Sequence, residues 1–208
     1  FLFDLSERIK NTQKNRNLRD EGIRFCINLM DKPLLPSKLH IPAARPENIK
    51  RIDLLRKLDA DRLIKLILVS APAGFGKSTA IADWIRSTGQ PSAWVSLEDS
   101  DNDPIRFLSY ILAALQTVDP NLDDSALVFF QSPSGSALEA ALTVLISQLE
   151  EIESDFLLVV DDYHLIREHS IHQILEFILD HQPLHLHIVL LTRADPPLTL
   201  GKLRANKQ

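Results

Sequence analysis

The chain has 208 residues, which is enough for one well-packed domain, and its 45% hydrophobic and 25% charged residues are those of an ordinary soluble globular protein. Its single cysteine excludes an internal disulfide and favours a reducing, cytoplasmic location. No apolar run approaches the ~20 residues that cross a bilayer, so we expect no membrane partner.

Charge is distributed unevenly along the chain. Residues 1–65 hold 15 Lys and Arg against 9 Asp and Glu, whereas residues 66–208 hold 8 against 19. Because an acidic body repels a nucleic acid backbone, any action on DNA requires another part of the protein to touch it.

The first 33 residues form a polar and charged extension, and the composition changes sharply after Met30, the only methionine. Two interpretations stay open. Either Met30 is the true start and the preceding residues are upstream translation, or residues 1–33 are an ordinary N-terminal extension. We expect one domain over residues 34–208.

Helical and strand-like patterns alternate through this domain. Apolar residues at three-residue steps predict a helix from Pro46 that ends before Asp59. The elements predicted after it are a strand at 66–70, a helix at 77–87, a strand at 93–97, a helix capped by Asp103-Pro104, a helix at 136–152, a strand at 156–160, a helix around 171–178 and a strand at 186–191. Residues 119–135 are rich in Asp, Pro, Ser and Gly, which predicts a loop.

Alternating strands and helices predict an α/β fold, a three-layer sandwich in which helices cover both faces of a parallel sheet. The chain stops at Gln208, soon after the fourth predicted strand. We therefore expect a fold truncated before its last strand.

The strongest chemical signal lies between the first predicted strand and the next helix. Its sequence is Ala71-Pro72-Ala73-Gly74-Phe75-Gly76-Lys77-Ser78-Thr79. This matches the phosphate-binding P-loop pattern, except that alanine replaces the first glycine, a change that is tolerated if that position needs no positive φ.

Each polar part of this loop has a role in the P-loop pattern. The glycines let successive amides point at phosphate oxygens, Lys77 reaches the β and γ phosphates, and the Ser78 hydroxyl ligates magnesium. The alternative is a glycine-bearing turn without a ligand, but the Lys-Ser pair at the start of a helix argues against it. The sequence therefore predicts binding of ATP or ADP with Mg²⁺.

A second signal is the apolar strand that ends in Asp161-Asp162, 84 residues after Lys77. In P-loop enzymes such a strand holds magnesium, so we expect Asp161 to bind the ion, usually through water, and Asp162 to orient or deprotonate the attacking water. A buried strand with an acidic end is common by itself, but together with the loop it is specific.

Arg193 follows the fourth predicted strand and is a third candidate. If that strand lies between the lysine-bearing and acid-bearing strands, its end faces the γ-phosphate, where an arginine can distinguish triphosphate from diphosphate. The alternative is a solvated arginine that begins a loop. We expect His181, His185 and His187 to be surface imidazoles near a turn, and Trp94 to be a core residue.

Several stretches together resemble the large ATP-dependent regulators of the LuxR type, which belong to the STAND class of signal-transduction ATPases. The stretches are residues 35–42, 45–46, 49–55, 70–79, 94–102, 107–115, 158–164, 191–197 and 203–206. The resemblance implies that an opening segment, 34–58, lies over the adenine and that Arg51 helps to bind the base.

The resemblance also implies that the domain is a switch. An unknown small-molecule or protein inducer permits exchange of ADP for ATP, the ATP form self-associates, and slow hydrolysis resets it. DNA would be bound only through a C-terminal helix-turn-helix that this chain lacks.

Two other functions are weighed against this one. An AAA+-like mechanical ATPase usually ends its acidic strand in Asp-Glu, whereas Asp161-Asp162 favours a weak, slow ATPase. A small-molecule kinase needs a lid with several arginines, but residues 100–155 contain only Arg106. We therefore predict the switch.

Overall fold

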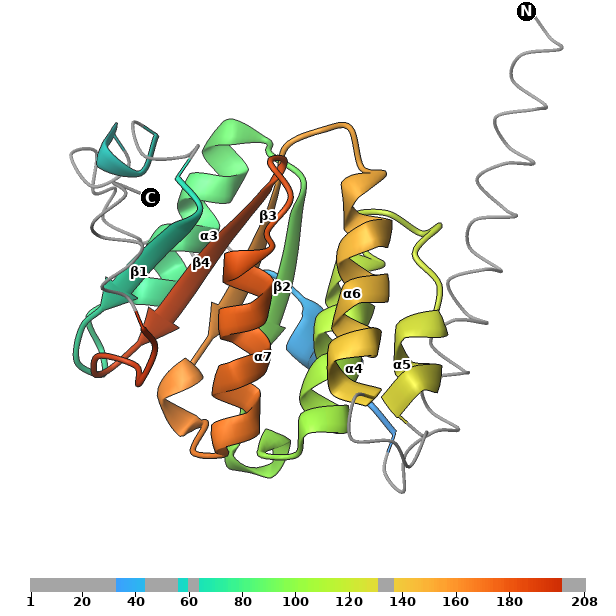
Figure 1. The fold of residues 1–208 in the computed structure, drawn as a ribbon. Helices are drawn as coiled ribbons and strands as arrows, with labels where there is room; N and C mark the ends of the chain where they lie inside the picture. Colours follow the sequence, from blue (N-terminus) through green and yellow to red (C-terminus); the bar gives the residue numbers. More distant parts are fainter. Residues whose placement is uncertain (1–32, 44–55, 60–63, 131–136, 200–208) are drawn as a thin grey trace, which may run out of the picture.

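The computed structural model describes residues 33–43, 56–59, 64–130 and 137–199 (Figure 1). Within these ranges lies one sheet of four strands, β1 (Leu66–Ser70), β2 (Ser92–Ser96), β3 (Phe156–Asp161) and β4 (Leu186–Thr192). All pair in parallel, in the order β1-β4-β3-β2. The predicted parallel α/β sheet is confirmed, and β4 lies between the P-loop strand and the acidic strand.

Helices connect the strands, and those that the sequence predicted agree with the prediction to within two residues at the bounds it gave. They are α3 (Lys77–Thr88), α4 (Pro104–Leu115), α5 (Ser125–Phe130), α6 (Ala137–Glu150) and α7 (His169–Asp180), with short 3₁₀ turns η1 (Pro36–Leu39), η2 (Asp99–Asp101) and η3 (Tyr163–Leu165). Local chemistry sets the ends. The Asp103 carboxylate accepts the Arg106 amide at 2.8 Å before α4, and Gly89 ends α3 with φ +68°.

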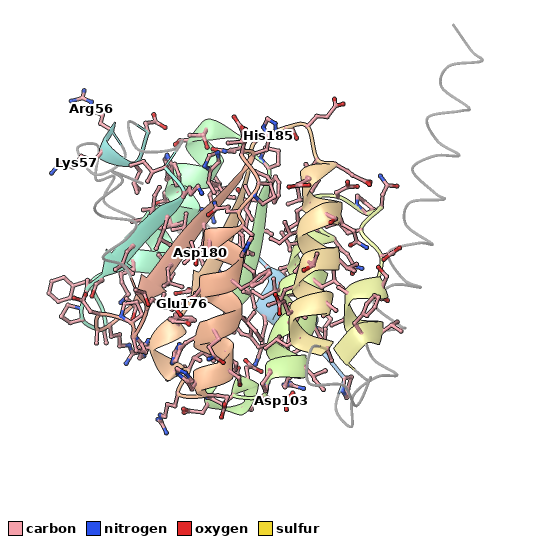
Figure 2. All side chains as sticks on the ribbon, in the orientation of Figure 1. Arg56, Lys57, Asp103, Glu176, Asp180 and His185 are labelled. Carbon is pink, nitrogen blue, oxygen red and sulfur yellow. The ribbon has the colours of Figure 1, made fainter. Side chains whose placement is uncertain are left out.

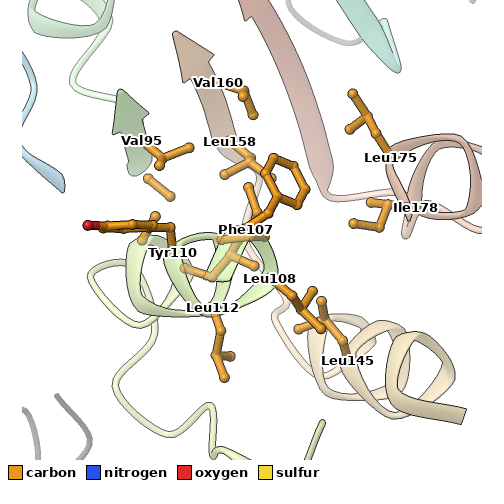
Figure 3. Packing of buried hydrophobic residues seen from close by; sticks show 14 of the residues in the cluster. Val95, Phe107, Leu108, Tyr110, Leu112, Leu145, Leu158, Val160, Leu175 and Ile178 are labelled. Atoms are coloured by element: carbon orange, nitrogen blue, oxygen red, sulfur yellow. The ribbon is translucent and has the colours of Figure 1, made fainter. Parts of the chain in front are cut away.

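Helices cover both faces of the sheet, as the sequence predicts. Alternate strand residues point to opposite faces, so Trp94 packs with the α3 side and Val95 with the other. On that other face, α4, α6 and α7 meet the strands through Phe107, Leu108, Leu145, Leu158 and Leu175, among others (Figure 3). The sheet and the helices on its two faces therefore form a three-layer sandwich.

The predicted loop at 119–135 is wrong for residues 125–130, which form α5. Asp123 accepts the Ser125 amide at 2.9 Å and so supports the start of the helix. Ala126 and Leu127 are each 1% exposed because they pack into the main core. Burial of these apolar residues outweighs a composition that locally favours a loop.

Several predictions fall on residues outside the described ranges. Of the helix predicted from Pro46, only residues 56–59 are described; they are helical, and Leu58 is buried. Met30, Arg51 and the segment after residue 199 lie outside, so the predicted start, the adenine contact and the truncation before a last strand stay predictions. Among the described helices, none is long and apolar enough to cross a membrane.

Candidate nucleotide-binding site

The carboxyl ends of three strands bring the predicted site residues to one edge of the sheet. Ser70, the last residue of β1, pairs with Thr192 of β4, and Asp161 ends β3 on the other side of β4. Open parallel sheets bind their ligands at this edge, where the loops after the strands converge. The strand order thus places residues 71–79 and Arg193 at the same edge as Asp161.

The loop after β1 has the backbone of a phosphate cradle. Gly74 and Gly76 adopt φ of +80° and +71°, which glycine tolerates and other residues rarely do. Of the described non-glycine residues only Asp162 has a positive φ, so Ala71 meets the condition under which alanine is tolerated. Residues 72–76 are exposed, including Phe75, whereas Thr79 is partly buried on α3.

The N-terminus of α3 is ready to receive an anion. Gly76 stands at its N-cap, no side chain caps the first turn, and that turn contains no acidic residue. The first amides of a helix lack partners within the helix and form the positive end of its dipole. These amides fit a phosphate group.

Lys77 already lies over the loop. Its ammonium donates to the carbonyl oxygens of Ala71 at 2.7 Å and Pro72 at 3.2 Å. The cationic group is thus held at the mouth of the loop, next to the uncapped amides. A phosphate in the loop would exchange these neutral carbonyls for charged oxygens, which bind an ammonium more strongly.

Asp161 is a buried carboxylate, 4% exposed, at the end of β3. Burial raises its pKa, and the neighbouring Asp162 carboxylate raises it further, while a hydrogen bond from Ser78 and the charge of Lys77 act in the opposite direction. The Ser78–Asp161 contact joins the two residues predicted to hold magnesium. A divalent cation beside them would offset the cost of burying this negative charge, so the donor set fits Mg²⁺.

Asp162 and His164 follow in the turn after β3. The Asp162 backbone has φ +56°, and its amide donates to the Asp161 carboxylate at 2.9 Å. Its own carboxylate lies 3.8 Å from Nδ1 of His164, an atom that is buried and has no hydrogen-bond partner among the described residues. Burial lowers the pKa of His164, and the charges of Arg193 and Lys77 lower it further, so a neutral imidazole stands among the site residues.

Sequence reasoning assigned no role to His164. The available signal was its place two residues after the acid pair, but a histidine near a strand end is usually an ordinary surface residue. Only the tertiary structure shows that its ring nitrogen is buried beside Asp162. Arg193 is exposed just after β4 and is close enough to His164 to lower the pKa of that histidine. Arg193 therefore lies at the end of the fourth strand, where the sequence places it.

The histidines away from this edge differ from the prediction in one case. His181 is exposed and His185 half-exposed, but His187 is 3% exposed, so its prediction as a surface residue is wrong. It lies in β4 and alternates with Val189 and Leu191, so it belongs to the face of the sheet that α3 covers. Trp94 is fully buried, which confirms it as a core residue.

The fold and the loop together define the class of protein, an α/β fold of the P-loop NTPase kind. No family model matches the chain. The chain is nevertheless MalT-like in sequence. It is 38% identical to the HTH-type transcriptional regulator MalT of Serratia proteamaculans over 175 residues, 37% identical to that of Yersinia enterocolitica over 175 residues, and 34% identical to that of Vibrio cholerae over 171 residues.

The matched residues make up 82–84% of this chain, and the chain spans 19% of the length of each of these relatives. The chain is thus similar to one segment of these regulators.

Proposed function

We propose that this chain binds ATP with Mg²⁺ at the carboxyl edge of its sheet and serves as the switch domain of a MalT-like transcriptional regulator. One observation carries the binding proposal. An uncapped helix N-terminus bearing Lys77 meets a buried carboxylate, Asp161, that is hydrogen-bonded to Ser78. Positive groups for phosphate and oxygen ligands for a divalent cation thus stand together.

Each residue has a distinct part in this proposal. The amides of residues 72–79 and the Lys77 ammonium bind the β and γ phosphates. Ser78 and Asp161 hold Mg²⁺, which when bound neutralises negative charge that builds up on the phosphates. Asp162 orients the attacking water, and Arg193 binds the γ-phosphate and so distinguishes ATP from ADP.

The switch is proposed from the sequence and from the relatives. Because the acidic strand ends in Asp161-Asp162, we propose slow hydrolysis, with an ATP form that self-associates and an ADP form at rest. The relatives are transcriptional regulators named for a helix-turn-helix. We therefore propose that DNA is bound by another part of the protein, in the cytoplasm, under control of an inducer that the segment itself does not identify.

The binding proposal is tested by titrating ATP into the 208-residue chain by calorimetry, with and without Mg²⁺. Lys77→Met is expected to weaken ATP binding roughly 10- to 100-fold, since a hydrogen bond to a charged group contributes about 1.5–3 kcal/mol. Lys65→Met is the matched control, because Lys65 precedes β1 at the opposite edge of the sheet.

Lys65→Met is expected to bind ATP like the parent. Equal affinity in the parent and in Lys77→Met would overturn the assignment of the loop. Fast hydrolysis of ATP by the parent chain would instead favour a mechanical ATPase over a switch.

A further inference from the structure

A buried ion pair joins residues 33–43, the first described part of the chain, to the turn after β2. Lys38 is 4% exposed and Asp101 is fully buried, and their charged atoms lie 2.7 Å apart. Burial by itself lowers the pKa of Lys38, but hydrogen bonds to Asp101 and Glu98 outweigh it and the pKa is raised. Lys38 is therefore charged, and its ammonium is shared between Asp101 at 2.7 Å and Glu98 at 3.0 Å.

Tyr110 of α4 forms a second attachment for the same segment. Its hydroxyl accepts the backbone amide of Leu35 at 3.1 Å and a side-chain nitrogen of Arg106 at 3.2 Å. Figure 3 shows the Tyr110 ring within the apolar cluster and its hydroxyl oxygen at the edge. Arg106 also donates to Asp101 at 3.0 Å, so Asp101 has two cationic partners.

The next residue, Asn102, attaches the turn after β2 to the chain beyond the acid pair. Its side-chain amide donates to the Leu165 carbonyl at 2.8 Å, and its oxygen accepts the backbone amides of Arg167 at 2.6 Å and Glu168 at 3.1 Å. One side chain thus satisfies three backbone groups between η3 and α7. This stretch directly follows Asp162 and His164.

We propose that Asn102 is a positioning residue for the turn that contains Asp162. We also propose that the ion pair between Lys38, in residues 33–43, and Asp101 fixes the position of Asn102. Asp101 and Asn102 are consecutive, so a shift of one moves the other. Unpairing a buried charge is costly, which makes the link stiff. The inference rests on the proposed function, because it gives this link a role at the nucleotide site.

The first test is Asn102→Ala, with Asn121→Ala, at an exposed asparagine, as the matched control. Hydrogen exchange of the Arg167 and Glu168 amides, followed by NMR, is expected to speed up about tenfold or more, because both amides lose their acceptor. ATP affinity is expected to stay within about twofold of the parent. The hydrolysis rate is expected to fall by about tenfold or more, since small misplacements of reacting groups are costly.

Asn102→Asp is the conservative variant. It keeps an acceptor for the Arg167 and Glu168 amides and loses the donor to the carbonyl oxygens of Leu165 and Asp99. Protection of the two amides is expected to recover in it. If Asn102→Ala leaves the hydrolysis rate at the parent value while the amides exchange faster, the residue is merely structural and the positioning role is overturned.

The second test is Lys38→Met, which removes the ammonium, keeps an unbranched side chain and leaves Asp101 paired with Arg106. Exchange of the Arg167 and Glu168 amides is expected to speed up, although Lys38 touches neither residue. Lys65→Met is the control and is expected to leave them unchanged. Faster exchange confined to residues 33–43 would overturn the link.

These outcomes are separable from the proposed function. If the parent chain does not bind ATP, the proposed function fails and with it the role of Asn102 at the site. The exchange measurements need no nucleotide, so they still decide whether the link between the two segments exists.

Discussion

The two edges of the sheet both place a carboxylate next to β3, but in opposite surroundings. At the amino edge, Asp155 lies 3.0 Å from His185, and these side chains are 47% and 44% exposed. At the carboxyl edge, Asp161 is 4% exposed and is hydrogen-bonded to Ser78. Figure 2 shows His185 at the amino edge and Asp103 near the carboxyl edge.

This difference shows what distinguishes a site carboxylate from a surface one. In a parallel sheet, each helix begins near the carboxyl edge, so uncapped amides gather there and attract anions. The amino edge receives helix C-termini, whose dipoles have the opposite sign. A buried carboxylate is costly unless a cation joins it, and only the carboxyl edge can bring a cation together with a polyphosphate.

The sharpest test of the comparison is Asp161→Asn, which removes the charge and keeps the shape. The gain in ATP affinity that Mg²⁺ gives is expected to fall about tenfold or more, because a charged ligand is lost. Calorimetry with and without Mg²⁺ measures it. Asp155→Asn, before the same strand, is the control and is expected to keep the full Mg²⁺ effect.

The same variant also has a stability consequence. The folded pKa of Asp161 lies above its ordinary value of 3.8, so the folded chain holds the proton more tightly than the unfolded chain. The stability that protonated Asp161 contributes is therefore lost as pH rises from its unfolded pKa to its higher folded pKa. Its ionised form destabilises the folded chain at neutral pH. Asp161→Asn is expected to melt slightly higher than the nucleotide-free parent. A lower melting temperature for Asp161→Asn would contradict the stated cost of burying the ionised carboxylate. Equal ATP binding with and without Mg²⁺ in the parent would contradict the proposed role of Asp161 in holding Mg²⁺.

A smaller and more selective effect is expected from Arg193→Ala. ATP affinity is expected to fall roughly 10-fold, since one charge-assisted hydrogen bond contributes about 1.5 kcal/mol or more. ADP affinity should stay within about twofold, because ADP has no γ-phosphate. Competitive displacement of a fluorescent nucleotide measures both. Equal losses for ATP and ADP would remove the sensing role from Arg193.

The smallest effects concern stability at the two edges. Asp103→Ala removes the N-cap of α4 and is expected to cost about 1 kcal/mol of unfolding free energy. Asp155→Ala breaks an exposed hydrogen bond to His185 and is expected to cost less than about 0.5 kcal/mol. Urea denaturation of both variants measures the two losses of unfolding free energy. A larger loss for Asp155→Ala than for Asp103→Ala would contradict the prediction.

The sequence predicted much of the fold because its signals are local. Apolar runs mark β1, β3 and β4, and Asp103-Pro104 marks the start of α4. Local composition misled at residues 125–130, where burial of Ala126 and Leu127 makes a helix out of a segment that reads as a loop. The exposure of His187 was misjudged because its burial depends on its place on the sheet face that packs with α3, which local composition does not show.

By itself, the sequence predicted a phosphate-binding loop, since the order of glycines, lysine and serine is a local property of the nine residues 71–79. It also determined that an acid pair ends a buried strand. Only the tertiary structure decided that β4 lies between β1 and β3, that His164 faces Asp162, and that Lys38 and Asn102 are joined through Asp101. The strand order and the Lys38–Asp101 pair connect residues far apart in the chain, and their partners are chosen by packing and by the pairing of buried charges. Asp162 and His164 are only two residues apart, but the burial of the His164 ring nitrogen depends on the fold around it.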